Sequence, residues 1–322
     1  MKFHPVIAAL RSDRAPQRRA QEAMAQACEA WRSEPGIAET LEELGAFGRG
    51  APLEACGTLE RIFTERAEAE RMIGALCRHL AQALMVAPLG HPPLRHGFSG
   101  EASTLLLARS GRAQLVLRAR EPGQGRIAHV TFRDGLRYEA VLAGEARGSI
   151  VRRCGPAGSA PRLYEEPIAL GPGARLAFDC RAEALLVEEV DRRLVSLRLH
   201  RQSAELAPTT EHDRATGQLL GQSCGDLATS RREMMVALLG RMGRAEAAPL
   251  LAEMAREPGD ASLRWQALRE SLALETATGF AALGAIARRA DDPLAANAGA
   301  LRAQLIEAHP QLRRLEEPQC PA

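Results

Sequence analysis

The chain has 322 residues with 42 basic and 40 acidic side chains, so its formal net charge is only +2. The chain as a whole therefore has no excess of positive charge that would attract the phosphate backbone of a nucleic acid. Aromatic residues, at 3%, are too few to form a surface on which bases stack. No apolar run approaches the roughly 20 residues that span a bilayer. We therefore expect a cytoplasmic protein that binds neither nucleic acid nor a membrane.

The cysteines and the sequence motifs do not indicate a cofactor. The seven cysteines are never closer than 21 residues, so they form neither a CxxC pair nor the framework of a secreted disulfide-rich domain. No Walker-type loop, GxGxxG or HExxH occurs. Lys2 is the single lysine, and a bacterial type of genome composition explains this arginine bias as well as selection for bidentate anion contacts does. We expect no metal, no cofactor and no catalytic residue.

Residues 1–90 are predicted to form an N-terminal helical region. Ala15 to Trp31 has apolar side chains at spacings of three and four, which is typical of an amphipathic helix. A shorter helix is predicted from Ile37 to Ala46. The apolar positions from Leu59 to Leu84 predict one long helix that ends before Pro88.

Residues 91–205 alternate in the manner of a β-domain. Val195, Leu197 and Leu199 fall on one face of a strand, and the residues between them fall on the other. The same alternation occurs in the segments 115–120, 128–132 and 136–142, with turn residues between them. About eight or nine strands joined by short turns must pair antiparallel, in a sandwich, a jelly roll or a barrel. We favour a jelly roll.

The run Leu170-Gly171-Pro172-Gly173, which precedes the predicted strand Ala174 to Phe178, resembles the proline-glycine turn of cupin-like proteins. The resemblance covers about 100 residues and implies a jelly-roll fold. Cupin metal centres require a His-x-His pair with a Glu and a later His, and this sequence contains no His-x-His. His91 and His96 lie in a proline-rich segment that lacks further ligands. The resemblance therefore implies a cupin-like module without its metal.

Residues 206–322 are predicted to be a linker followed by helical repeats. Arg231, Arg264 and Asn297 lie 33 residues apart, as do the apolar triplets Met235, Leu268, Leu301 and Leu239, Leu272, Leu305. Each unit is predicted to hold two helices with a short break between them. The repeat resembles the short HEAT-like repeats of α-solenoids over Thr229 to His309, about two and a half units. The fold class predicted for the whole chain is thus α+β and multidomain, with helical regions flanking the β-domain.

The polar faces of the predicted strands carry a set of basic side chains. Two interpretations stay open: they are ordinary solvated residues, or they form a concave basic surface that holds an anionic ligand. In the second case Arg198 offers donors suited to a carboxylate or phosphate, and His200 gives a contact that depends on pH near neutrality. Alternation alone also predicts that replacing both leaves the melting temperature nearly unchanged. The candidate ligand-binding residues are Arg118, Arg120, His129, Arg198 and His200.

Two classes of function are compatible with these patterns. The first is a non-enzymatic interaction, regulatory or scaffold protein whose cupin-like module binds a small anionic ligand and whose repeats bind a protein partner. The second is a metal-dependent cupin-type enzyme, of the oxygenase or isomerase class. The absence of clustered metal ligands favours the first class.

Overall fold

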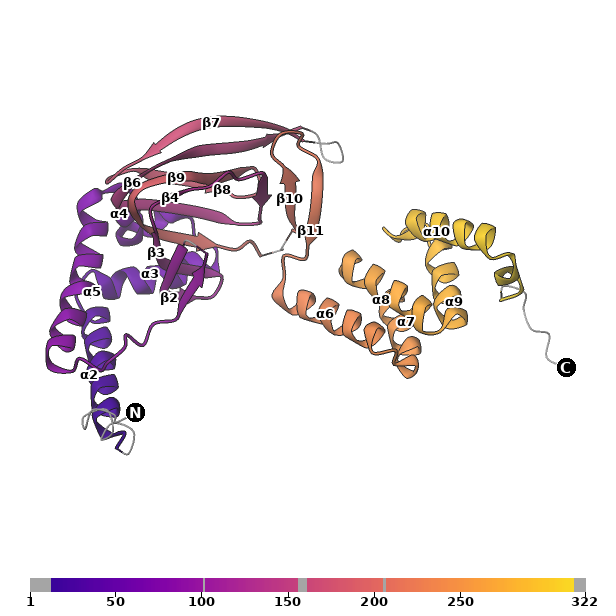
Figure 1. The fold of residues 1–322 in the computed structure, drawn as a ribbon, viewed down its shortest axis with the longest axis horizontal. Coiled ribbons are helices and arrows are strands. Elements are labelled where there is room, and N and C mark those ends of the chain that lie inside the picture. The colour runs from indigo at the N-terminus through magenta and orange to yellow at the C-terminus, as the bar shows by residue number, and fades with distance from the viewer. Residues whose placement is uncertain (1–12, 101, 156–160, 205–206, 316–322) are drawn as a thin grey trace, which may run out of the picture. The chain divides into compact units, whose positions relative to one another are not determined.

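Figure 1 shows the computed structural model of the chain, which describes residues 13–100, 102–155, 161–204 and 207–315. The chain divides into two compact units, Met1–Gln222 and Ser223–Ala322. It is an α+β protein, as predicted, with N-terminal helices, a central antiparallel sheet and a C-terminal helical region. Within the described ranges, no helix is both long and apolar enough to cross a membrane.

The N-terminal helices match two of the three predictions. The helix predicted from residue 15 is present, and the one predicted from residue 37 extends to Arg49 and ends at Gly50, whose φ of 125° favours glycine. The prediction of one long helix is wrong, because Glu65 is extended and interrupts it. At about 100° per residue, the buried side chains before and after Glu65 would face different directions in one continuous helix, and the break lets both sets reach one core. The helices are α2 (Ala15–Arg32), α3 (Ile37–Arg49), α4 (Gly57–Thr64) and α5 (Arg66–Val86), with a 3-10 turn η1 (Leu53–Ala55).

The strands of the first unit form two antiparallel sheets within the described residues. The larger has eight strands in the order β1-β2-β3-β9-β6-β7, with β4 paired to β9 and β8 to β6, and the smaller has the order β11-β10-β5. The strands are β1 (His96–Ser99), β2 (Ala102–Ser110), β3 (Ala113–Arg120), β4 (Gly123–Gln124), β5 (His129–Phe132), β6 (Leu136–Cys154), β7 (Arg162–Leu170), β8 (Arg175–Asp179), β9 (Glu183–Arg201), β10 (Thr209–Asp213) and β11 (Leu219–Ser223).

The long strands β6 and β9 pair along most of their length and bend at several bulges. Gly144 lies at one of them, with a φ of 89°, and a Cβ atom there would come within 2.1 Å of the Arg193 carbonyl oxygen. Only glycine therefore allows the two strands to approach at this bend. The bulges let one pair of strands contribute to several separate parts of the β-domain core.

One face of the large sheet packs directly on the N-terminal helices. Trp31, Phe47 and Met72 from the helices share a buried core with Leu115 of β3 and Leu197 of β9. The Trp31 indole Nε1 donates a hydrogen bond of 3.2 Å to the Met72 carbonyl oxygen, which satisfies its one polar atom. The N-terminal helices and the β-domain thus share one buried core within the first unit.

The first compact unit extends to Gln222. Strand β10 pairs with β5, with His212 opposite Val130 and Thr210 opposite Phe132, and β11 joins the same sheet through β10. Alternation does not indicate β10, because only one of its side chains, His212, is buried.

The second unit is a C-terminal helical region. Helices α6 and α7 are separated by a break at Gly243, whose φ is 64°. Helices α8 and α9 follow after Asp260. The Asp260 carboxylate is the N-cap of α8 and accepts a hydrogen bond of 2.9 Å from the Leu263 amide. Together the helices enclose a core of their own. They are α6 (Leu227–Arg241), α7 (Ala248–Arg256), α8 (Ala261–Leu274), α9 (Thr276–Ala287) and α10 (Ala295–Ala308), with 3-10 turns η2 (Ala245–Ala247) and η3 (Pro310–Leu315).

Candidate functional site

The candidate site lies on the face of the large sheet that is turned away from the helices. In β3, β9 and β6, side chains such as Leu115, Leu197 and Ala140 point into the core shared with the helices. Their neighbours along each strand point to the opposite side. The register places Val116 and Glu139 on either side of Arg198. We call this side the inner face, and it carries Gln114, Val116 and Arg118 of β3, Ser196, Arg198 and His200 of β9, and Arg137, Glu139 and Val141 of β6.

A buried carboxylate lies at the centre of the inner face. Glu139 accepts a hydrogen bond of 2.9 Å from Arg198 Nη2 and one of 2.7 Å from the Ser196 hydroxyl. Arg137 Nε lies 3.7 Å from the same carboxylate, which is an ion pair but too long for a hydrogen bond. Burial raises the pKa of Glu139, but Arg198 and Arg137 outweigh it and hold that pKa below its ordinary value. Glu139 is therefore ionised at neutral pH.

The inner face carries more positive charge than Glu139 can balance. Arg118 has no ion-pair partner within the described residues, and burial together with the nearby Arg198 lowers its pKa to about 10, so it stays protonated at pH 7. The Nε and Nη2 atoms of Arg137 and the Nε atom of Arg198 are buried without a hydrogen-bond partner in the described structure. Side chains of Arg198 and Arg137 remain 21% and 15% exposed, so a small solute can still approach them. Three guanidinium groups thus surround a single carboxylate.

Two other arginine networks of this unit are balanced, although Arg120 and Arg175 also have buried nitrogen atoms without a hydrogen-bond partner in the described structure. Arg181 makes a bidentate pair with Asp134, which is almost wholly buried. Arg214 lies between Glu165 and Glu188 and donates to both. Buried donors normally find acceptors, and each one left without an acceptor destabilises the fold. The inner face departs from this rule, whereas these neighbouring networks follow it.

His200 lies on the inner face, opposite Arg137 across the β6/β9 pairing. Burial, together with Arg198 and Arg137, lowers the pKa of His200 to about 4. The expectation that His200 makes a contact pH-dependent near neutrality is therefore wrong for the ligand-free protein, because the imidazole is already neutral there. A neutral imidazole offers one donor and one acceptor beside the guanidinium groups.

The structure brings together three of the five predicted residues, Arg118, Arg198 and His200. Arg120 has the same facing as Arg118 but donates a hydrogen bond of 2.8 Å to the Val187 carbonyl oxygen, so it is partly committed to the backbone. His129 is exposed on β5, in the smaller sheet, where it pairs in register with Asp213. It does not join the cluster on the inner face.

Sequence reasoning missed Arg137, Glu139 and Ser196 as site residues. Alternation already placed Arg137 and Glu139 on the polar side of a strand, and in the structure both side chains are largely buried. Arg137 also packs over the Phe178 ring of β8, 4.4 Å from its centroid. The sequence signal that could have identified them is the pair of opposite charges, Arg137 and Glu139, at alternate positions of one predicted strand.

The residues present do not suit the metal that a cupin-like fold implies. His200 and Glu139 are the metal-ligand types on the inner face, and guanidinium groups surround both. A divalent cation there would be repelled by Arg118, Arg137 and Arg198. Throughout the part of the chain that the structure describes, no group of three or more His, Cys, Asp or Glu side chains could hold a metal ion.

Comparisons with known proteins show a similarity of fold and nothing further. No protein-family model matches the chain, and no curated protein matches it. In its central β-region the chain resembles solved cupin-superfamily structures at low identity. A 7S globulin of Momordica charantia has a TM-score of 0.27 and 12% identity, covering 38% of this chain and 36% of the globulin. A cupin superfamily protein of Desulfitobacterium hafniense has a TM-score of 0.24 and 17% identity, covering 33% of this chain and 83% of that protein.

Ectoine synthase from P. lautus is similar to the same extent, with a TM-score of 0.24 and 12% identity over 33% of this chain and 68% of the synthase. The chain thus spans about a third of the globulin and larger shares of the other two proteins. Similarity at this level carries no information on the ligand or activity of this chain.

Proposed function

We propose that this chain is a non-enzymatic regulatory or scaffold protein. Its cupin-like β-domain binds a small anionic ligand on the inner face, and its C-terminal helices bind a protein partner. The observation that carries the proposal is the excess of guanidinium over carboxylate groups among Arg118, Arg137, Arg198 and Glu139.

The chemistry of the inner face supports an oxyanion. A guanidinium group presents donors in a fixed planar fork that matches a carboxylate or phosphate. Arg118, Arg137 and Arg198 lie on three adjacent strands, so their positions are set by the sheet and little ordering is needed on binding. An anion placed among them would supply the missing acceptors and neutralise the excess charge. Because the surroundings are already desolvated, each such contact is stronger than at an exposed site.

The residues of the inner face do not favour catalysis. Glu139 is held as an ion by Arg198 and Ser196, which leaves it a poor general base. Burial raises the pKa of the nearby Cys180 thiol, so this cysteine is not an activated nucleophile. These side chains are therefore better suited to binding a ligand than to catalysing a reaction.

The partner-binding part of the proposal rests on the helices. The 33-residue period and the helix pairs α6/α7 and α8/α9 support the HEAT-like interpretation, in which stacked helix pairs present an extended surface to a protein. We take the C-terminal unit to be a short α-solenoid of this kind.

The anion-binding part can be tested by a thermal-shift screen of the full chain. The probes are inorganic phosphate, sulfate, citrate, malate and adenosine monophosphate at low ionic strength, with chloride as the reference. We expect at least one multivalent anion to raise the melting temperature in proportion to ln(1 + [L]/Kd). A Tm that no probe shifts beyond chloride would contradict the proposal. Elemental analysis of the same sample should show no stoichiometric transition metal, and about one tightly held ion per chain would favour the cupin-type enzyme instead.

A further inference from the structure

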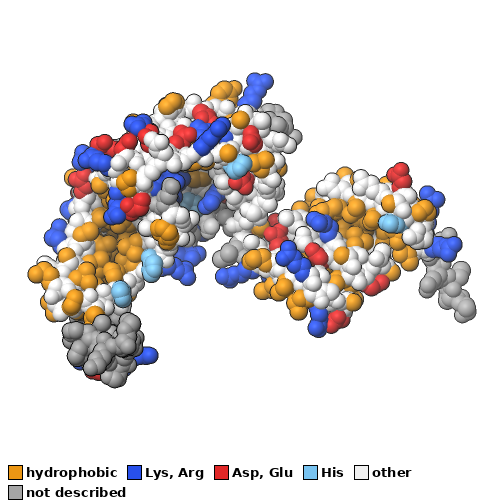
Figure 2. Space-filling model, viewed as in Figure 1, with side chains coloured by type: hydrophobic (Ala, Val, Ile, Leu, Met, Phe, Trp, Pro, Cys, Tyr) orange, Lys and Arg blue, Asp and Glu red, His pale blue; other side chains and the backbone are white. Residues whose placement is uncertain are grey.

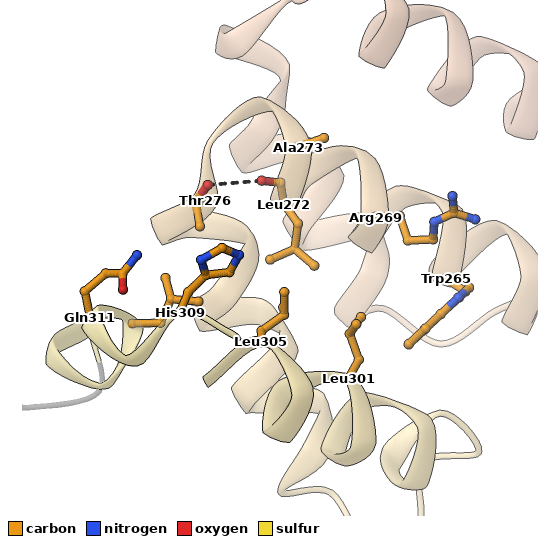
Figure 3. A pocket seen from close by; sticks show the side chains of 10 residues that line it. Trp265, Arg269, Leu272, Ala273, Thr276, Leu301, Leu305, His309 and Gln311 are labelled. Carbon is orange, nitrogen blue, oxygen red and sulfur yellow. Dashed lines mark hydrogen bonds between the residues drawn. The ribbon is translucent and has the colours of Figure 1, made fainter. Parts of the chain in front are cut away.

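A groove in the second unit runs between α8 and α10 (Figure 3). Its volume is about 750 Å³, and Figure 2 shows hydrophobic side chains gathered in a hollow of this unit. Figure 3 shows Leu272, Leu301 and Leu305 in the middle of the groove, with Trp265 and Arg269 toward one end. At the other end are Thr276, His309 and Gln311.

The groove exists because α8 and α10 stand apart. Helix α8 packs closely on α6, the first helix of the preceding pair, whereas its contact with α10 is slight. Helix α9 packs against both α8 and α10, and its first residue, Thr276, lines the groove. The lining residues of α8 run from Trp265 to Ala273, which at 1.5 Å per residue is a length of about 12 Å, or a little over two helical turns. An occupant of this shape is elongated, as a short helix is.

The lining combines an apolar floor with a basic rim. Trp265, Leu272, Leu301 and Leu305 remain partly exposed where they face the groove, although each also packs against the core. Arg269 is exposed, and no carboxylate pairs with it within the described residues. No acidic side chain lines the groove. The rim therefore favours a negatively charged neighbour.

We infer that this groove binds an amphipathic helix of a partner protein, with its apolar stripe on the leucines and an acidic side chain opposite Arg269. The inference rests on the partner-binding part of the proposed function and names its site. Such helices present anchors at positions i, i+3 or i+4 and i+7, which span about 10.5 Å and fit the length of the groove along α8.

The charges disfavour a second copy of this chain as the occupant. Helix α6 has an exposed apolar face with Met234, Met235 and Leu238, and the exposed Met242 follows directly after the helix. The same helix carries Arg231, Arg232 and Arg241, and seating it in the groove would bring further arginines toward Arg269. An acidic helix from another protein has the complementary charge.

The test is a selection of 16-residue helical peptides from a randomised display library on the immobilised full chain. Enriched peptides are then synthesised, and their binding is measured by fluorescence anisotropy. We expect an apolar stripe with flanking Asp or Glu, and a dissociation constant that rises about tenfold or more in Arg269→Glu, since reversing a rim charge replaces attraction by repulsion. Arg241→Glu is the matched control on an exposed arginine outside the groove, and it should bind like the wild type.

Three results would overturn the inference. Enriched peptides that bind Arg269→Glu and wild type equally would place protein binding elsewhere on the chain. A chain that self-associates in sedimentation and loses peptide binding as it does so would put a second copy in the groove. A library without enrichment over the blank would remove the partner-binding part of the proposed function as well. The anion screen reads the first unit, so it stays informative in each case.

Discussion

The two units each bury arginine, and they do so in opposite ways. In the helical unit, Arg264 pairs with the equally buried Asp292 and donates a hydrogen bond of 3.0 Å to the Ala255 carbonyl oxygen, so charge and donors are both matched. On the inner face of the β-domain, Arg198 and its arginine neighbours share the single carboxylate of Glu139. In the helical unit each buried charge has a counter-charge. In the cluster on the inner face, positive charge exceeds negative charge, and an anionic ligand could balance it. The same residue type is thus structural in one unit and a candidate ligand contact in the other.

Breaking the matched pair should have the largest effect. Replacing Asp292 with Ala leaves the Arg264 guanidinium buried without a counter-charge and the Leu294 amide without its acceptor. We expect the free energy of unfolding to fall by about 3–5 kcal/mol, measured by urea denaturation. Asp291→Ala, an exposed neighbour, is the control and should change it by less than about 0.5 kcal/mol. If both substitutions lower the free energy of unfolding equally, the ion pair between Arg264 and Asp292 is not the cause of the loss.

Arg198→Met should have the next largest effect. The substitution removes the hydrogen bonds from Arg198 to the buried Glu139, and Arg137 and Arg118 compensate only in part. We expect a loss of about 2 kcal/mol, which replaces the expectation from alternation alone of an almost unchanged melting temperature. Arg126→Met, at an exposed position of the same unit, serves as the control. A variant as stable as the wild type would mean that the Glu139 pair contributes little.

His200 should make the stability of the first unit depend on pH. Its pKa is 6.5 in the unfolded chain and about 4 in the folded one, so the unfolded state binds more protons between these values. Stability is then fully present above pH 6.5 and is lost as the pH falls toward 4, with a slope of at most about 1.4 kcal/mol per pH unit. Arg198, Arg137 and Arg133 are the charged groups near the imidazole, and they disfavour its protonation.

Denaturation of His200→Gln across this pH range should show a shallower slope than the wild type. His129→Gln, at an exposed histidine, should keep the wild-type slope. If all three proteins have one slope, the imidazole of His200 titrates normally and is not desolvated.

Arg118→Gln should have the smallest effect on stability. Arg118 has no ion-pair partner within the described residues, and its removal relieves repulsion among the guanidinium groups. We expect a change below about 1 kcal/mol, in the stabilising direction, read from the same urea titrations. A loss of 2 kcal/mol or more would make Arg118 structural and would erase the contrast with Arg264.

The sequence predicted local patterns well and their spatial consequences less well. Period-2 alternation correctly separated Val195, Leu197 and Leu199 from Arg198 and His200, because side-chain facing along a strand is a local property. It could not show that Glu139 would lie beside Arg198, since that contact depends on the pairing of β6 with β9, across a long stretch of chain.

The same limit explains why His129 was grouped with residues of the other sheet and why one long helix was predicted where two are present. Alternation gives the facing of His129 but not the sheet to which β5 belongs, and β5 pairs with β10. Apolar spacing found the buried residues of α4 and α5, but not the change of phase at Glu65 that separates the helices.

The central claim is that the inner face of the β-domain binds an anion through its unmatched guanidinium groups. Its most direct test is isothermal titration of the wild type, Arg118→Gln and the control Arg126→Gln with phosphate and with citrate at low ionic strength. We predict that Arg118→Gln keeps its fold and loses affinity at least about tenfold, as expected for a charge-assisted contact, while Arg126→Gln binds like the wild type. Equal affinity of all three proteins, or no binding of either anion to the wild type, would contradict the claim.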